Sequence, residues 1–110
     1  MAYNSELERV LDAETSGWEG LAKKPMFGGL GYLLHGNMCV GIWRDQLIGR
    51  VGDEAHVLKR IASVSDMDIT GRPMTGWVKV SPEGWQDEKT RRTILDASLA
   101  WVRTLPKKPQ

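Results

Sequence analysis

The sequence is poor in the side chains that most often bind metals or form covalent cross-links. Its 110 residues include a single cysteine, Cys39, and two histidines, His35 and His56. One cysteine excludes a disulfide within the chain and suits a reducing compartment. The two histidines are far apart in the sequence and form no zinc-binding spacing with Cys39. We therefore expect no metal site and no cofactor.

A dominant charge and a long apolar run are also missing. The 15 basic and 14 acidic residues give a net charge of +1, so no overall attraction to nucleic acid or membrane is expected. The longest uncharged stretch, residues 25–43, contains five glycines and is a poor membrane helix. The N-terminal residues lack the apolar segment of a secretory signal. We expect a cytoplasmic protein without a membrane segment, formed by a single domain over residues 1–110.

The stretch 26–51 predicts the centre of the fold. It contains three short apolar segments, 26–34, 38–43 and 47–51, separated by turn residues. Connections this short join antiparallel neighbours, so we expect a three-stranded meander. In its middle strand, alternation predicts one face formed by Met38, Val40 and Ile42 and the other by Cys39, Gly41 and Trp43.

Helices and two further strands are predicted around this meander. We expect a first helix from Asn4 or Ser5 to Gly17, followed by a connector over residues 18–25. After the meander we expect a helix capped by Asp53 and ending near Ala62, strands at 65–70 and 74–80, a turn at 81–84, and a long helix from Asp87 to Pro106. The order α-β-β-β-α-β-β-α predicts a two-layer α+β fold, with helices on one face of a five-stranded antiparallel sheet.

No catalytic residue is predicted. Cys39 lies in an apolar strand and is expected to be a buried small hydrophobe. Gly29-Leu30-Gly31 begins like a dinucleotide-binding loop, but the third glycine would fall at Leu34 and a strand follows where a helix is required. We expect these glycines to allow a bulge or a close approach of another element. The protein is therefore expected not to be an enzyme.

Four residues are candidates for an interaction site: Arg50, Arg72, Trp43 and Trp77. Arg72 precedes a proline in a turn, where a fixed guanidinium could bind an anion or, as we favour, pair with Asp66 or Asp68. Of the five tryptophans, most are expected at the rim of the core, and one or two could line a binding face. Four dibasic pairs keep direct DNA binding open, although ordinary solvated surface explains them equally: Lys23-Lys24, Lys59-Arg60, Arg91-Arg92 and Lys107-Lys108.

Two blocks of sequence resemble a known family. MFGGLGYLLHGNMCVGI at 26–42, with LIGRVG at 47–52, and MDITGRPMTGWVKVSPEG at 67–84 are similar to the N-terminal domain of the TfoX (Sxy) competence regulators. The resemblance implies the same α+β order. It also implies a coactivator role at promoters of DNA-uptake genes, although members with that role carry a second, helical domain, and we expect a stand-alone version here. The family supplies no catalytic motif to place on this sequence.

These observations lead to three functional hypotheses. The first is a non-enzymatic regulatory domain that binds another protein, with transcriptional co-regulation implied by the resemblance. The second is a small-molecule-binding domain or enzyme in which Arg50 and Arg72 hold an anion. The third is direct binding to DNA through the dibasic pairs. A homodimer is also expected, because an uncovered sheet face and spare tryptophans suit self-association.

Overall fold

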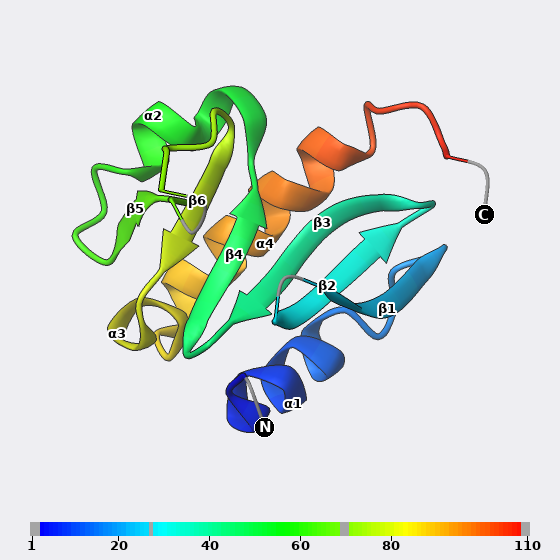
Figure 1. The fold of residues 1–110 in the computed structure, drawn as a ribbon, viewed down its shortest axis with the longest axis horizontal. Coiled ribbons are helices and arrows are strands. Elements are labelled where there is room, and N and C mark those ends of the chain that lie inside the picture. The colour runs from blue at the N-terminus through cyan, green and yellow to red at the C-terminus, as the bar shows by residue number, and fades with distance from the viewer. Residues whose placement is uncertain (1–2, 27, 69–70, 109–110) are drawn as a thin grey trace.

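The computed structural model describes residues 3–26, 28–68 and 71–108. It is built on one six-stranded antiparallel sheet with the strand order β1-β2-β3-β4-β6-β5 (Figure 1). The strands are β1 (Leu21–Met26), β2 (Gly29–Leu34), β3 (Asn37–Trp43), β4 (Gln46–Arg50), β5 (Val64–Asp66) and β6 (Trp77–Val80). The helices are α1 (Ser5–Glu14), the 3-10 turn η1 (Gly52–Glu54), α2 (Ala55–Leu58), α3 (Pro82–Trp85) and α4 (Glu88–Val102).

The α+β class and the antiparallel sheet are confirmed, but the expected five strands are wrong. The supposed connector at 18–25 contains β1, which forms one edge of the sheet. Its residues are mostly exposed, so the apolar alternation that marks a strand is missing. Pro25 and the two lysines are tolerated because an edge strand pairs on one side only. The expected first strand, 26–34, is instead divided by a turn at Gly28, whose φ is +75°.

The elements after the meander are also shorter than expected. The strand expected at 65–70 is β5, and residues 69–70 lie outside the described part of the chain. The strand expected at 74–80 begins only at Trp77, whose N–H donates to the Met74 carbonyl in a turn. The helix expected from Asp53 to Ala62 is η1 followed by α2, and Asp53 makes no capping hydrogen bond. The turn expected at 81–84 is the short helix α3, which begins at Pro82.

Both long helices cover the same face of the sheet. Helix α1 contacts Tyr32 through Asp12, which accepts a hydrogen bond from the Tyr32 hydroxyl. Tyr32 pairs with Val40 on the next strand, and Val40 pairs with Gly49 on the one after it. Gly49 in turn faces α4: a Cβ on it would lie 2.9 Å from both Ile94 Cγ2 and Ser98 Oγ. Directly paired residues point to one side, so α1 and α4 share a face (Figure 1). The main hydrophobic core lies between these helices and the sheet.

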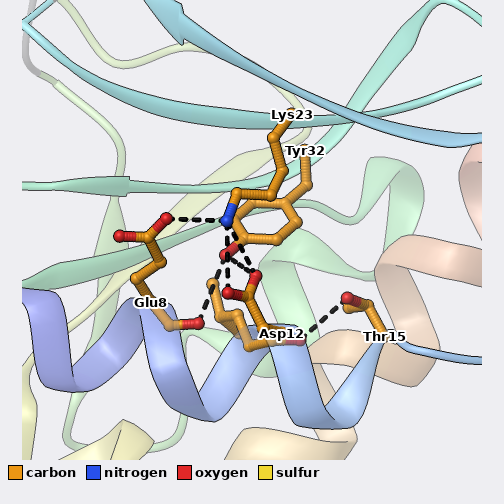
Figure 2. A network of polar contacts seen from close by, with 6 residues as sticks. Glu8, Asp12, Thr15, Lys23 and Tyr32 are labelled. Carbon is orange, nitrogen blue, oxygen red and sulfur yellow. Dashed lines mark hydrogen bonds and ion pairs between the residues drawn. The ribbon is translucent and has the colours of Figure 1, made fainter.

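Helix α1 is attached to the sheet by apolar and polar contacts. Leu7 and Leu11 are fully buried against the core. Figure 2 shows the polar side, where Lys23 Nζ lies 2.7 Å from Glu8 and 3.1 Å from both Asp12 carboxylate oxygens. The Tyr32 hydroxyl donates to Asp12 at 2.8 Å. This network connects α1 to β1 and β2, and thus fastens the N-terminal helix over the first half of the sheet.

A register shift corrects the expected alternation in β3. The pairing moves by one residue between Tyr32 and Leu33, so that Cys39 has no direct partner. Val40 and Ile42 belong to the core, as expected, but Cys39 joins them with no exposed surface. Met38 lies on the opposite face, where its Cε is 2.7 Å from the position that a Cβ on Gly41 would take. The prediction of faces was therefore wrong for Met38 and Cys39.

Candidate interaction face and groove

The face of the sheet opposite α1 and α4 is the first candidate site, and we call it the open face. One row of directly paired residues crosses all six strands on this side: Lys24, Gly31, Gly41, Ile48, Lys79 and Ser65. Ile48 is 1% exposed, yet it lies outside the main core cluster, as expected for a residue of the second face. The open face thus has its own small apolar centre.

The middle of this row consists of two directly paired glycines, Gly31 and Gly41. The methionines beside them fill the space: Met26 Sδ is 2.7 Å from the Cβ position of Gly31, and Met38 Cε is equally close to that of Gly41. Thioether side chains are flexible and adapt to different neighbours. The centre of the open face therefore lacks two Cβ atoms and is covered by two side chains that can change rotamer; we call this place the glycine trough.

Two arginine–tryptophan pairs stand at the ends of β4. The Arg44 guanidinium carbon is 4.5 Å from the centroid of the Trp43 ring, and that of Arg50 is 5.3 Å from the centroid of Trp77. Trp43 pairs with Gln46 at the start of β4, and Arg50 pairs with Trp77 at its end. The rise of an antiparallel strand separates the two pairs by roughly 14 Å. Three of the four predicted residues therefore share the open face.

The tryptophans divide between the two faces. Trp85 is buried in the core and its indole N–H donates to the Asp45 carbonyl at 2.7 Å. Trp18 and Trp101 are partly buried and pack against the same core. Trp43 and Trp77 are half-buried and do not belong to the core cluster. The distribution matches the expectation that one or two indoles are placed on a separate face.

Arg72 lies apart from the other candidates. It is exposed in the loop between β5 and β6. The favoured pairing of Arg72 with Asp66 or Asp68 is wrong, because Lys59 binds Asp66 at 2.7 Å and Lys79 binds Asp68 at 2.9 Å. The Lys79 ammonium donates to the Asp68 carboxylate and lowers the pKa of that group below its usual value. Lys59, seven residues before Asp66, and Lys79, 11 residues after Asp68, thus take the partners predicted for Arg72.

A groove at the η1 end of the sheet was not predicted. A hollow of about 500 Å³ lies between η1–α2 and the segment before β6, and it is lined by Gly52, Asp53, Ala55, His56, Lys59, Asp66, Pro73, Met74, Thr75, Gly76 and Trp77. A second hollow of about 190 Å³ is lined by Arg50, Gly52, Asp53, Thr75, Gly76, Trp77 and Trp101. The two hollows have five lining residues in common, so we treat them as one groove.

Two glycines with left-handed backbone form the floor of the groove. Gly52 has a φ of +60° and Gly76 a φ of +85°. The N–H groups of Val51 and Gly52 both donate to the Gly76 carbonyl, at 2.8 and 2.9 Å. A Cβ on Gly52 would lie 2.1 Å from the Trp101 ring, so only glycine allows α4 to approach here. The sequence contains little signal for this contact, because Gly52 follows the strand predicted at 47–51 but Gly76 lies inside the strand predicted at 74–80.

The only cysteine has no means of acting as a nucleophile. Cys39 is completely buried, and burial raises the pKa of its thiol to about 12. A thiol with this pKa is protonated near neutral pH and reacts slowly. The expected role of Cys39 as a small buried hydrophobe is confirmed. Among the residues that the structure describes, no group of three or more histidine, cysteine or acidic side chains could hold a metal ion.

The dibasic pairs come from four separate parts of the fold. They lie on β1, at the end of α2, on α4 and in the C-terminal segment. In three of the pairs carboxylates already bind the charges: Lys23 binds Glu8 and Asp12, Lys59 binds Asp66, and Arg91 and Arg92 both contact Glu14. Within residues 3–26, 28–68 and 71–108, no helix has the length and apolar character needed to cross a membrane.

Comparison with known proteins identifies the family of the chain. Searches of curated proteins and of solved structures gave no match. A scan against protein families matches residues 14–101 to the TfoX N-terminal domain. This range contains the whole sheet, both hollows and the two blocks of sequence that resemble that family. The chain therefore belongs to the TfoX N-terminal domain family.

Proposed function

We propose that this domain is a non-enzymatic regulatory module that binds an acidic segment of another protein through its open face. The observation that carries the proposal is the division of the sheet. Both long helices cover one face, and the opposite face presents two arginine–tryptophan pairs on either side of a glycine trough. Tryptophan and arginine are the residues most often found at the energetic centres of protein interfaces.

The two arginines are suited to recognise carboxylates. Each guanidinium lies over an indole, which holds its planar donor groups in place, so little side-chain entropy is lost on binding. Neither Arg44 nor Arg50 forms an ion pair with another described residue. Their charges are therefore available to a partner.

The charge and the shape of the open face indicate the chemistry of the partner. Its basic groups are Lys24, Arg44, Arg50 and Lys79. Of the acids near them, Asp68 is bound to Lys79, Asp45 follows Arg44 in the sequence, and Asp53 lines a hollow together with Arg50. An acidic segment would complement this excess of positive charge. An apolar anchor from the same segment would enter the trough above Gly31 and Gly41, where the methionines can move aside.

The family supports a regulatory role of this kind, including transcriptional co-regulation through a protein partner. We propose action through a protein rather than directly on DNA because carboxylates bind half of the dibasic charges and the four pairs lie on separate parts of the fold. The buried, protonated thiol supports the proposal that the domain is not an enzyme. A homodimer through the open face is the competing arrangement.

Site-specific photo-crosslinking in cells tests the proposal. A photoreactive phenylalanine derivative replaces Trp43 on the open face or, as a matched control, Lys89, which is exposed on α4. We expect position 43 to give an adduct with a single acidic protein and position 89 to give none. The same adducts from both positions, or no adduct from position 43, would overturn the proposal. An adduct of twice the mass of the chain would show that a second copy covers the face.

A further inference from the structure

We propose that the groove at the η1 end of the sheet is a binding site for a small aromatic carboxylate, with Arg50 as the carboxylate ligand and Trp77 as the aromatic wall. This inference goes beyond the protein-binding role proposed above. It concerns the two hollows that meet at Gly52 and Gly76, where no bound partner protein is required.

The groove has the size and composition of a small-molecule site. Its hollows measure about 500 and 190 Å³, and pockets for small ligands usually span a few hundred Å³. Trp77 lines both hollows and is the aromatic residue that they share. Ala55, Pro73 and Met74 add apolar surface to the larger hollow, and Trp101 adds an indole to the smaller one. These surfaces favour an aromatic body.

Arg50 is the cation of the groove that remains available for a ligand. Lys59, the other permanently charged base in the lining, is bound to Asp66 at 2.7 Å. Arg50 has no acidic partner among the described residues and lies over Trp77 with its guanidinium carbon 5.3 Å from the ring centroid. The guanidinium of an arginine is a planar fork of donors, and this fork matches the two oxygens of a carboxylate.

The groove is already formed in the free protein. The Gly76 carbonyl accepts hydrogen bonds from two successive N–H groups, which fixes the segment before β6 to the end of β4. Trp101 packs directly against the Cα of Gly52, so its ring has little freedom. A ligand would therefore enter without a costly rearrangement of the backbone.

The same contacts argue for a carboxylate rather than a phosphate. Phosphate sites commonly use several backbone N–H groups together with more than one base. Here the N–H groups of Val51 and Gly52 are occupied by the Gly76 carbonyl. Asp53 also lines both hollows and would repel a dianion more strongly than a monoanion. One guanidinium without an acidic partner among the described residues, in a hollow that Trp77 and Trp101 also line, suits a single planar negative charge.

An NMR titration of the complete chain tests the site. The probes are benzoate, acetate, benzyl alcohol and inorganic phosphate, followed through backbone amide and indole N–H signals. We expect benzoate to give saturable shifts at Gly52, Gly76 and the indoles of Trp77 and Trp101. Acetate and benzyl alcohol should bind more weakly than benzoate, because acetate lacks the aromatic ring and benzyl alcohol lacks the carboxylate. Absence of saturable shifts with benzoate, or phosphate binding as tight as benzoate, would overturn the proposal.

Variants separate the ligand site from general electrostatics. Arg50→Gln should raise the Kd for benzoate by about tenfold or more, as expected for the loss of a charge-assisted hydrogen bond. Arg44→Gln is the matched control, because Arg44 lies over Trp43 at the other end of β4, and the Kd should not change. Asp53→Asn should lower the Kd, and this gain is a readout that misfolding would not produce. An equal loss in both arginine variants, or no gain in Asp53→Asn, would contradict the assignment.

The groove and the open face share Arg50 and Trp77, and Trp43 separates the tests of the two proposals. Trp43 lies on the open face but does not line the groove, so Trp43→Ala should leave benzoate binding unchanged while it weakens the protein interaction.

Discussion

The hydroxyl group of Tyr32 offers a quantitative test of how α1 is attached to the sheet. The ring is fully buried and its hydroxyl donates to the Asp12 carboxylate at 2.8 Å. Asp12 is partly open to solvent, with 45% of its side chain exposed, so water can replace the phenol when Tyr32→Phe removes it. A hydrogen bond lost in this way costs about 1 kcal/mol of unfolding free energy near neutral pH. Urea unfolding followed by tryptophan fluorescence measures this cost.

The Tyr32 hydroxyl also predicts the direction in which the free energy of unfolding changes with pH. Burial, and then the bond to Asp12, raise the pKa of Tyr32 far above its ordinary value of 10.0. The stability that the protonated phenol contributes is complete below pH 10 and is lost as the pH rises toward the folded-state pKa. Lys23 acts in the same direction, because its hydrogen bond to Glu8 raises the pKa of its ammonium. The free energy of unfolding of the wild type should therefore fall above pH 10.

The slope of the unfolding free energy against pH distinguishes the wild type from Tyr32→Phe. Each group that binds a proton more tightly in the folded state adds about 1.4 kcal/mol of destabilisation per pH unit above its unfolded pKa. Tyr32→Phe removes one such group, so its unfolding free energy should fall less steeply than that of the wild type between pH 10 and the alkaline limit. Parallel curves for the two proteins, or a loss in the variant that grows with pH, would refute the structural reasoning.

Three other predictions follow from single contacts. Gly49→Ala should lower the free energy of unfolding by about 1–3 kcal/mol in urea titrations, because its Cβ would lie 2.9 Å from Ile94 and Ser98. An unchanged urea midpoint would show that α4 does not pack against Gly49. Trp85→Phe should lower it by about 1–3 kcal/mol, since the Asp45 carbonyl loses its 2.7 Å indole donor. Cys39 should resist thiol reagents in the native protein at pH 8 and react once urea unfolds it; rapid native labelling would contradict its burial.

The meander was predictable because its pattern is strong and local. Apolar residues dominate 38–43 and 47–51, and turn residues separate these segments. The β1 strand was missed for a physical reason: as an edge strand it carries Lys23, Lys24 and Pro25, and little of it is buried. The bulge that reverses Met38 and Cys39 depends on pairing with β2, which a local pattern does not encode.

The candidate residues could be predicted only singly. Arg50 and Trp77 meet because β4 pairs with β6, although η1, α2 and β5 lie between them in the sequence. Trp101 reaches the groove because Gly52 lets α4 approach, a contact that depends on the packing of the whole domain. The pairing expected for Arg72 was wrong because Lys59 and Lys79 bind the two aspartates instead. Non-local contacts therefore determine both the open face and the groove.

The most direct test of the central claim measures the affinity of the crosslinked partner after charge reversal on each face. In one protein, Arg44 and Arg50 of the open face become glutamate. In the control, Lys89→Glu and Arg103→Glu reverse two exposed charges at the ends of α4. The account predicts that the open-face variant loses at least about tenfold in affinity, as expected when charge-assisted contacts are lost, and that the control stays near the wild type. Equal losses in both variants, or an unchanged affinity in the open-face variant, would contradict the claim that this protein binds its partner through the open face.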